Sequence, residues 1–254
     1  NPVTLGLSIQ AYSYLCIVYP EKKSEYIGTI EKLKHKLSEL KSEGFSGDCW
    51  GYDFDWEARY ASIEAYKPTV VATGMITNSL YEYYKYSGDT TVMDMCRRSG
   101  EFVLKDLNRT YEEDTFCFSY SPYDRQIVYN ATMNGARILA QSGFQTEEAK
   151  STVKFVTANQ RKDGAWSYSK GDTRKWVDNI HTGYLLECLK EYRDHTNDDS
   201  VDSYLKKGFE YYINNFFYDS KIPKYYDNKI FPVDSSAISQ SILTLCKFGY
   251  VELA

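Results

Sequence analysis

The sequence predicts an all-α protein whose helical hairpins stack into an (α/α) toroid or partial toroid. Three observations support this fold. An aromatic-rich loop followed by a helix that opens with small and polar residues occurs four times, at intervals of about 50–60 residues. Apolar residues recur with helical spacing in about nine segments, and no segment of useful length alternates like a strand. Stacked hairpins gather their loops at one end, where we expect the functional site.

The repeat is defined by its loops and by the helices that follow them. The aromatic loop segments are residues 49–53, 117–121, 166–169 and 224–227. The helices after these loops are predicted to begin near Thr69, Val128, Asp178 and Asp234. Two helices with their loops therefore make up one repeat.

The first two predicted helices form a hairpin. The first covers residues 4–19 and ends at Pro20, and the second covers residues 21–43. The second helix has one apolar stripe (Ile27, Ile30, Leu33, Leu37 and Leu40) among Lys and Glu, a pattern typical of an outer helix with a solvent face. A long loop over residues 45–67 follows, and Pro68 stands at the entry of the third helix, as the preference of Pro for helix starts predicts.

The third, fifth, seventh and ninth predicted helices carry a polar stripe on an otherwise apolar surface. The stripes are Thr69, Thr73 and Thr77; Asn130, Asn134 and Arg137; Asp178 and His181; and Ser235, Ser236, Ser239 and Gln240. Such helices are buried on most sides, so we expect the polar stripes of these four to line a wet central cavity. Met75 of the third helix is expected to point away from that cavity. The even-numbered helices, such as the eighth over residues 199–217, are predicted to be outer helices.

Composition limits the class of protein. We expect one domain over residues 1–254, and the apolar helical pattern at its start suggests that an N-terminal hairpin is missing. A net charge of −5 without a basic block argues against nucleic acid and anionic membranes as partners. No stretch approaches the roughly 20 apolar residues of a membrane span. Six scattered cysteines without a C-x-x-C pair favour a reducing compartment, so we predict a cytoplasmic protein.

Two resemblances strengthen the prediction of a toroid. Residues 160–166 fit Q-x-x-D-G-x-W, which resembles the repeat element of terpene cyclases and prenyltransferases and the same turn in toroidal sugar-active enzymes. In such a turn Gly164 permits the backbone conformation and the Trp166 ring packs over a helix end.

Most of the chain also resembles one bacterial and archaeal family. The similar segments are residues 49–60, 68–74, 107–114, 117–124, 128–139, 175–189 and 223–234. Members of this family are found in surface-polysaccharide biosynthesis loci and are often labelled prenyltransferase-like. The resemblance implies a helical toroid and a glycan-related context, and it carries no catalytic assignment.

Two clusters are candidates for catalysis. Asp178 and His181 share a helix face, so a carboxylate and an imidazole could form an acid–base pair. The alternative is that Asp178 caps its helix and His181 makes one buried hydrogen bond. Asp53 and Asp55 lie between aromatic residues, as acids do in sugar-active sites, although a solvated loop is the alternative. Arg59 could hold a substrate carboxylate or neutralise these aspartates.

We predict a substrate-binding surface that draws on all four loops, because aromatic rings stack on sugars and polar side chains bind hydroxyl groups. Its members are Trp50, Tyr52, Trp56, Arg59, Tyr123, Tyr129, Asn130, Trp166, Tyr168, Lys175, Trp176, Asn179, Tyr225 and Asp234. The alternative for each is packing between helices or hydrogen bonding between loops.

Metal and cofactor sites are not expected. The chain has three histidines and no cysteines with ligand spacing. The segment Asp198-Asp199-x-x-Asp202 matches the DDxxD motif of prenyl-diphosphate enzymes, but it lies in a turn at the end opposite the large loops. There Asp199 is predicted to cap a helix.

The leading functional prediction is a carbohydrate-active toroid protein of polysaccharide biosynthesis or modification. As an enzyme it would be a lyase, epimerase or hydrolase that acts on an acidic, uronate-type glycan. One alternative is an isoprenoid cyclase or prenyltransferase-like enzyme, and another is a non-catalytic glycan-binding or scaffold subunit. The expected partners are a saccharide or glycan and polysaccharide-assembly proteins.

Overall fold

The computed structural model describes residues 1–58, 61–144 and 147–254, so the predicted site residue Arg59 lies outside the described residues. Within these ranges nine α-helices dominate, and the all-α prediction is confirmed. The helices are α1 (Pro2–Val18), α2 (Lys23–Glu39), α3 (Val70–Ser87), α4 (Thr90–Asp106), α5 (Tyr129–Gln141), α6 (Glu147–Ala158), α7 (Asn179–Thr196), α8 (Asp202–Asn215) and α9 (Ser235–Lys247).

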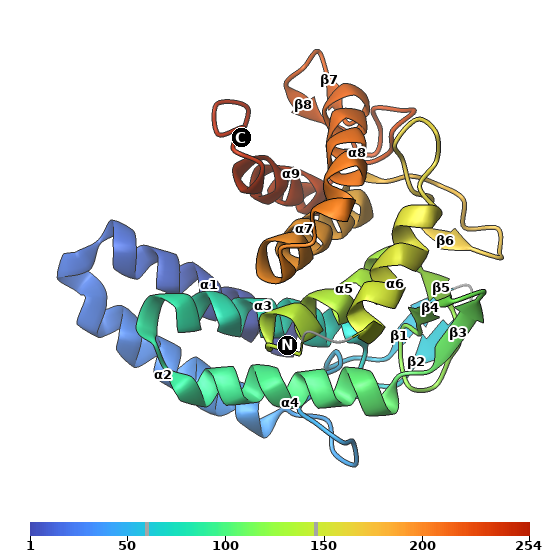
Figure 1. Ribbon diagram of the computed structural model, residues 1–254. Coiled ribbons are helices and arrows are strands. Elements are labelled where there is room, and N and C mark those ends of the chain that lie inside the picture. Colours follow the sequence, from blue (N-terminus) through green and yellow to red (C-terminus); the bar gives the residue numbers. More distant parts are fainter. Residues whose placement is uncertain (59–60, 145–146) are drawn as a thin grey trace.

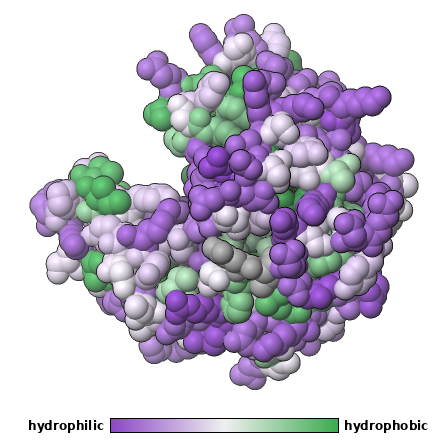
Figure 2. All heavy atoms as spheres, viewed as in Figure 1, coloured by the Kyte–Doolittle hydropathy of each residue, from purple (hydrophilic) through white to green (hydrophobic). Residues whose placement is uncertain are grey.

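The helices form two concentric layers (Figure 1). The odd-numbered helices pack in sequence, α1 against α3, α3 against α5, α5 against α7 and α7 against α9. The even-numbered helices lie behind them, with α2 on α1, α4 on α3 and α5, α6 on α5, and α8 on α7. The inner layer does not close from α9 back to α1, and Figure 2 shows a deep notch at this place. The described chain is therefore an open arc of a toroid.

Side-chain caps fix where three of the four repeated inner helices begin. Thr69 accepts a hydrogen bond from the Ala72 N–H, and Asp178 and Asp234 cap α7 and α9 in the same way. Val128 precedes α5 without a side-chain cap. The four helix starts predicted from the sequence are thus confirmed. At three of them a polar side chain satisfies N–H groups that the helix leaves free.

Four short antiparallel strand pairs among the described residues connect the loops, three of them hairpins. They pair β1 (Trp56–Ala58) with β2 (Ala61–Ile63), β3 (Arg109–Glu112) with β4 (Thr115–Phe118), β5 (Ile127–Val128) with β6 (Ser169–Lys170), and β7 (Phe217–Tyr218) with β8 (Ile222–Pro223). The sequence analysis missed these strands because each has only two to four residues. The β5–β6 pair joins loops of two different repeats and so fixes the start of α5 beside the loop that leads to α7.

Two tryptophans anchor equivalent loops to the outer helices. Trp50 Nε1 donates to the Leu37 carbonyl of α2 at 2.9 Å, and Trp166 Nε1 donates to the Val156 carbonyl of α6 at 2.8 Å. Trp50 is fully buried, so its predicted place on the stacking surface is wrong. The indole N–H instead satisfies a carbonyl at a helix end. Gly164 has φ +98°, which confirms the glycine turn predicted for the Q-x-x-D-G-x-W segment.

The threonine stripe of α3 does not line the cavity, contrary to the sequence analysis. Thr69, Thr73 and Thr77 are fully buried. Thr73 Oγ1 accepts from the Trp50 N–H at 3.1 Å, and Thr77 Oγ1 donates to the Thr73 carbonyl at 2.7 Å. Hydroxyls that bond to nearby backbone need no water, so polar spacing alone misidentified the face. The cavity face of α3 instead contains Met75, which the sequence analysis placed elsewhere.

The apolar core lies between the two helix layers and under the loops. Polar residues cover much of the surface that Figure 2 displays. Among the described residues, no helix is both long enough and apolar enough to cross a membrane.

Candidate functional site

A cavity of about 730 Å³ lies in the middle of the arc. All five inner helices contribute polar side chains to its wall: Gln10 from α1, Asn78 from α3, Arg137 from α5, Glu187 from α7 and Gln240 from α9. The predicted cavity between inner helices is present, but the predicted stripes line it only in part. Asn134 and Arg137 of α5 and Ser236, Ser239 and Gln240 of α9 lie on its wall, whereas Asn130, Ser235, Asp178 and His181 do not. Its volume is in the usual range for ligand sites, roughly 300–1,000 Å³.

The predicted contact between Asp178 and His181 forms at the start of α7, beside a small pocket, and the same helix continues into the wall of the large cavity. Asp178 is the N-cap of α7, and its Oδ1 accepts from the His181 backbone N–H at 2.9 Å. Both carboxylate oxygens also lie 2.8–2.9 Å from His181 Nδ1. The carboxylate is 1% exposed, whereas the imidazole is 32% exposed. The capping alternative and the pairing prediction therefore hold together, because one carboxylate serves both groups.

Aromatic rings enclose the pair. Tyr168 stacks on Trp176 with centroids 5.1 Å apart and meets the His181 ring edge-on at 4.6 Å. Trp176 Nε1 donates to Asp178 Oδ2 at 3.1 Å. Tyr184 lies edge-on to the other side of the imidazole at 6.3 Å. These contacts fix the ring orientation of His181, and a water-sized pocket of about 10 Å³ lies beside it.

One face of α7 connects the pair with the deeper cavity. His181, Tyr184, Glu187 and Glu191 follow one another at intervals of three or four residues, and the last three line the large cavity. The sequence analysis missed Tyr184, Glu187 and Glu191 because it ended the polar stripe at His181. Continuing the same helical spacing would have found them.

Two of these residues, Glu187 and Tyr184, have raised pKa values. Burial raises the pKa of Glu187, and hydrogen bonds from Thr244 and Gln240 oppose this effect. Burial also raises the pKa of the Tyr184 phenol well above its ordinary value. At neutral pH Tyr184 is therefore a phenol that can donate a hydrogen bond or a proton.

Both carboxylates of the predicted second pair are hydrogen-bonded to other residues. Asp55 Oδ1 accepts from the Ala65 N–H at 2.8 Å, and Asp53 Oδ1 accepts from Asn1 Nδ2 at 2.8 Å. Among the described residues, neither carboxylate is hydrogen-bonded to Asp178 or His181. Asp55 is thus bonded within its loop and Asp53 to the N-cap residue of α1, and neither lies in the group formed by Asp178 and His181.

Tyr52 and Trp56 belong to an aromatic cluster of the loop end. Trp56 stacks on Tyr120 at 5.7 Å with an interplanar angle of 9°, and Tyr52 stacks on Phe54 at 5.4 Å. Burial raises the pKa of Tyr52, whose hydroxyl also interacts with Tyr120. Each of these rings therefore has one face covered by a neighbouring ring, and Phe54 is 49% exposed.

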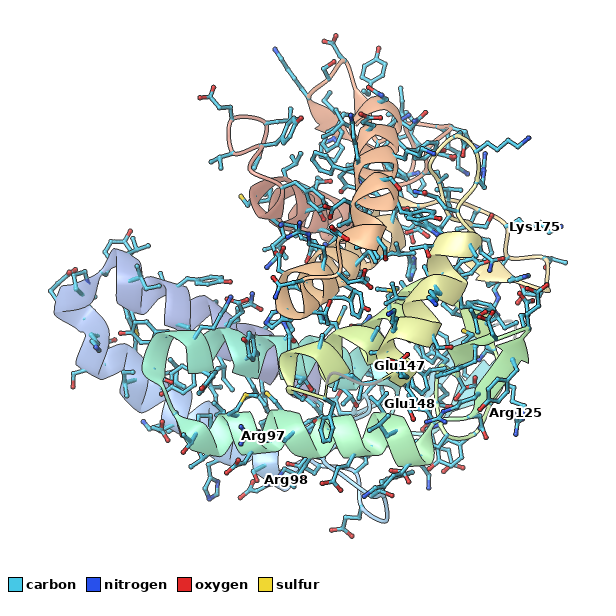
Figure 3. All side chains as sticks on the ribbon, in the orientation of Figure 1. Arg97, Arg98, Arg125, Glu147, Glu148 and Lys175 are labelled. Carbon is cyan, nitrogen blue, oxygen red and sulfur yellow. The ribbon has the colours of Figure 1, made fainter. Side chains whose placement is uncertain are left out.

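The other predicted binding residues divide into two groups by exposure. Tyr123 packs edge-on against Phe45 and is 55% exposed, and Lys175 lies at the outer edge of the loops (Figure 3). By contrast Tyr129 and Asn130 are buried beside the small pocket, where Asn130 Oδ1 has no hydrogen-bond donor.

Three predicted residues at α7 and α9 have structural contacts. Asn179 is fully buried and donates to the Lys224 carbonyl at 3.0 Å, so it cannot also bind a ligand in this structure, which corrects its predicted role. Asp234 caps α9. Tyr225 is half-buried at the mouth, and burial together with the nearby Asp178 raises its pKa to about 12.

The aspartate-rich segment occupies the turn between α7 and α8, at the end of α7 opposite Asp178. Asp198, not Asp199 as predicted, caps the short helix there through the Ser200 N–H, and it accepts from the Tyr192 hydroxyl at 3.0 Å. Asp202 pairs with Arg193 at 2.9 Å. Among the described residues, no three Asp, Glu, His or Cys side chains form a group that could hold a metal ion.

The repeats identify one position where α7 differs from its equivalents. Three residues after the N-cap, α3 has Ala72, α5 has Ala131 and α9 has Ala237, and all three are buried. The same position in α7 is His181. The scaffold therefore uses alanine here, and the imidazole is an exception at a single repeat.

Comparison with known proteins gives the fold a context. No protein-family model matches the sequence, and no curated protein is significantly similar to it. The fold is similar to the cellobiose 2-epimerase of Bacillus thermoamylovorans (TM-score 0.64, 9% identity), a similarity that covers 89% of this chain and 62% of the epimerase.

Two other toroids give similar values. One is a polysaccharide lyase (TM-score 0.64, 11% identity) and the other is a glycosyl hydrolase family 88 protein from Bacteroides vulgatus (TM-score 0.62, 12% identity). Each similarity covers 97% of this chain and 73% of the other protein. These similarities confirm the predicted toroid fold. The chain spans less than two thirds of the length of the Bacillus epimerase.

Proposed function

We propose that the protein is a carbohydrate-active enzyme whose reaction takes place at the loop end of the central cavity. The observation that carries this proposal is the Asp178–His181 pair, held among aromatic rings above a cavity of about 730 Å³. Proteins of similar fold are described as an epimerase, a polysaccharide lyase and a glycosyl hydrolase. At 9–12% identity they support the proposal only through their common fold.

His181 would be the general base. Its Nδ1–H donates to Asp178, and this partner assigns the tautomer in which Nε2 has a free lone pair. Nε2 can take a proton from a sugar carbon or from a hydroxyl group, and the buried carboxylate then stabilises the imidazolium that forms. The remaining exposure of the imidazole, 32%, gives a substrate access to it.

Tyr184 is the best-placed proton donor, because it contacts the imidazole and lines the cavity. Burial keeps its hydroxyl protonated at neutral pH. Asp53 and Asp55 have no part in this proposal because their hydrogen bonds go to Asn1 and to the Ala65 N–H. A base and a donor on one helix suit a lyase, an epimerase or a hydrolase, and we propose an acidic, uronate-type glycan as the substrate.

We also propose, from the sequence, a role in polysaccharide biosynthesis, assembly proteins as partners and a cytoplasmic location. The isoprenoid alternative is weaker because Asp198 and Asp202 of its aspartate-rich segment are bonded to Tyr192 and Arg193, at the end of α7 away from the pair.

Turnover of a panel of acidic and neutral oligosaccharides in D₂O tests the proposal. New reducing ends would indicate hydrolysis, an unsaturated uronate chromophore would indicate a lyase, and deuterium at a sugar carbon would indicate an epimerase. His181→Ala should abolish turnover and leave the helical circular-dichroism signal unchanged, because three other repeats have alanine at this position.

His35→Ala is the matched control, since this imidazole lies on the outer helix α2 and is 78% exposed. It should turn over substrate like the wild type. Full turnover by folded His181→Ala would refute the proposed base. Saccharide binding without turnover by the wild type would instead favour a glycan-binding or scaffold subunit, and magnesium-dependent binding of a prenyl diphosphate would favour the isoprenoid alternative.

A further inference from the structure

Arg137 is a buried cation in the wall of the central cavity. Its side chain is 6% exposed, and Nη2 donates to the Gly74 carbonyl at 3.0 Å and to Asn134 Oδ1 at 2.7 Å. Its Nε–H has no acceptor. Both acceptors of Nη2 are neutral, and within the described part of the chain no carboxylate forms an ion pair with the guanidinium. A buried charge without a counter-charge is unfavourable.

The other cation that lines this cavity is paired. Lys247 forms an ion pair with Glu191 at the lower end of the cavity. Glu82, from α3, pairs with Lys85 at 2.7 Å. Glu191 and Glu82 of the cavity wall therefore each have a lysine partner, whereas among the described residues Arg137 has no ion pair.

Glu187 is the acidic residue at the same depth as Arg137, since each lies eight residues after the first residue of its helix. It does not complete an ion pair, because it accepts hydrogen bonds from Gln240 and Thr244. Burial raises the pKa of Glu187, and the positive charge of Arg137 opposes this shift without a hydrogen bond between the two side chains. The positive charge of Arg137 therefore remains available to a ligand.

We propose that Arg137 binds the carboxylate of a uronic-acid unit in the middle of the central cavity. This inference rests on the proposed function and adds a substrate-binding residue to it. A guanidinium is suited to a carboxylate, since its N–H groups form charge-assisted hydrogen bonds. Gln240 also lines this cavity, and its amide oxygen can accept a hydrogen bond from a sugar hydroxyl group.

The position of Arg137 also determines the direction in which the substrate would lie in the cavity. Six residues of α7 separate His181 from Glu187, which corresponds to roughly 9 Å along the helix axis. A carboxylate at the level of Glu187 and Arg137 therefore lies well below the proposed base. The acidic unit would enter first, and the reacting unit would lie beside His181 at the mouth.

Calorimetry with matched ligands tests this inference. The probes are digalacturonate and a glucuronic-acid disaccharide, each compared with its methyl ester, which keeps the shape and removes the charge. The wild type should bind at least one acid about tenfold to a hundredfold more tightly than its ester, the range for a hydrogen bond to a charged group. In Arg137→Met the acid and the ester should bind equally.

Arg97→Met is the matched control, because Arg97 lies on the outer helix α4 (Figure 3) with 58% of its side chain exposed. It should keep the preference for the acid. Equal binding of acid and ester by the wild type would overturn the inference, and this result does not depend on the folding of a variant. A preference for the acid that survives in folded Arg137→Met would overturn it as well.

The two proposals fail separately. If His181→Ala loses turnover while Arg137→Met binds acid and ester as the wild type does, the catalytic proposal stands and the role of Arg137 is refuted. If the wild type binds no saccharide, both proposals are refuted.

Discussion

Replacement of Asp178 by Asn separates the two tasks of this carboxylate. The amide oxygen of Asn can still accept the His181 backbone N–H, and Asn is as good an N-cap as Asp. The amide NH₂ group would then face His181 Nδ1 and Trp176 Nε1–H, where the wild type has a carboxylate oxygen. Asp178→Asn therefore removes the charged acceptor and keeps the cap.

The expected loss of stability follows from these contacts. The carboxylate is 1% exposed, so solvent does not screen its hydrogen bonds. A hydrogen bond to a charged group contributes about 1.5–3 kcal/mol. Trp176 is 41% exposed, so its indole N–H can bond to water when the carboxylate is replaced. The expected loss of stability therefore includes only the hydrogen bond to the imidazole. For a chain of this size the loss corresponds to a decrease of about 3–12 °C in Tm.

Urea unfolding and thermal melts measure this loss, and Asp234→Asn is the control. Asp234 occupies the same N-cap position in α9, and within residues 1–58, 61–144 and 147–254 its side chain accepts only from the Ser236 and Ala237 N–H groups. Its replacement should therefore cost less than about 0.5 kcal/mol. Nitrogen NMR of the imidazole should show that the proton moves from Nδ1 to Nε2 in Asp178→Asn. Equal stability of the two variants with an unchanged tautomer would refute the proposed orientation of His181.

Three further predictions concern the scaffold and the cavity. Trp50→Phe and Trp166→Phe should each lose about 1–3 kcal/mol in urea unfolding, because each removes the indole hydrogen bond of a buried side chain and leaves space where the larger ring packed; a loss below 0.5 kcal/mol would contradict the anchoring role. Because burial raises the pKa of Glu187 above 4.5, the wild type loses stability as pH rises through that raised pKa. Glu187→Gln should therefore be more stable than the wild type at pH 8 and equal to it below about pH 4, and a constant difference would contradict this. In the native protein a thiol reagent should react quickly with one cysteine, Cys246, because the other five are buried; Cys246→Ser should abolish this fast phase.

The sequence was sufficient to predict the fold and the central pair of the site. Helix starts could be located because caps are local: Thr69, Asp178 and Asp234 each bond to N–H groups two or three residues later. The Asp178–His181 contact could be predicted for the same reason, since it depends only on one helical turn. Nothing beyond short-range geometry was needed for these conclusions.

Features that depend on tertiary packing could not be predicted. Trp50 and Trp176 look alike in the sequence as loop tryptophans, yet one is fully buried under α2 and the other is 41% exposed at the mouth. The hydroxyl of Thr73 likewise appears polar in the sequence, but it is satisfied inside the core by the backbone of Trp50. The role proposed for Arg137 likewise depends on packing, because Glu187 lies at its level but accepts its hydrogen bonds from Gln240 and Thr244.

The repeat itself gives the strongest argument that His181 has a function. Alanine is the best helix former and fills this buried position in α3, α5 and α9, so histidine costs up to about 0.7 kcal/mol of helix propensity in α7. The imidazole also needs a hydrogen-bond partner, and Asp178 provides one at 2.8 Å. The equivalent residue of α9, Asp234, serves as a helix cap. A scaffold that required only packing would have no use for this arrangement, because Ala72, Ala131 and Ala237 pack without it. The departure from the repeat therefore supports the proposal that His181 was selected for its chemistry and not for packing.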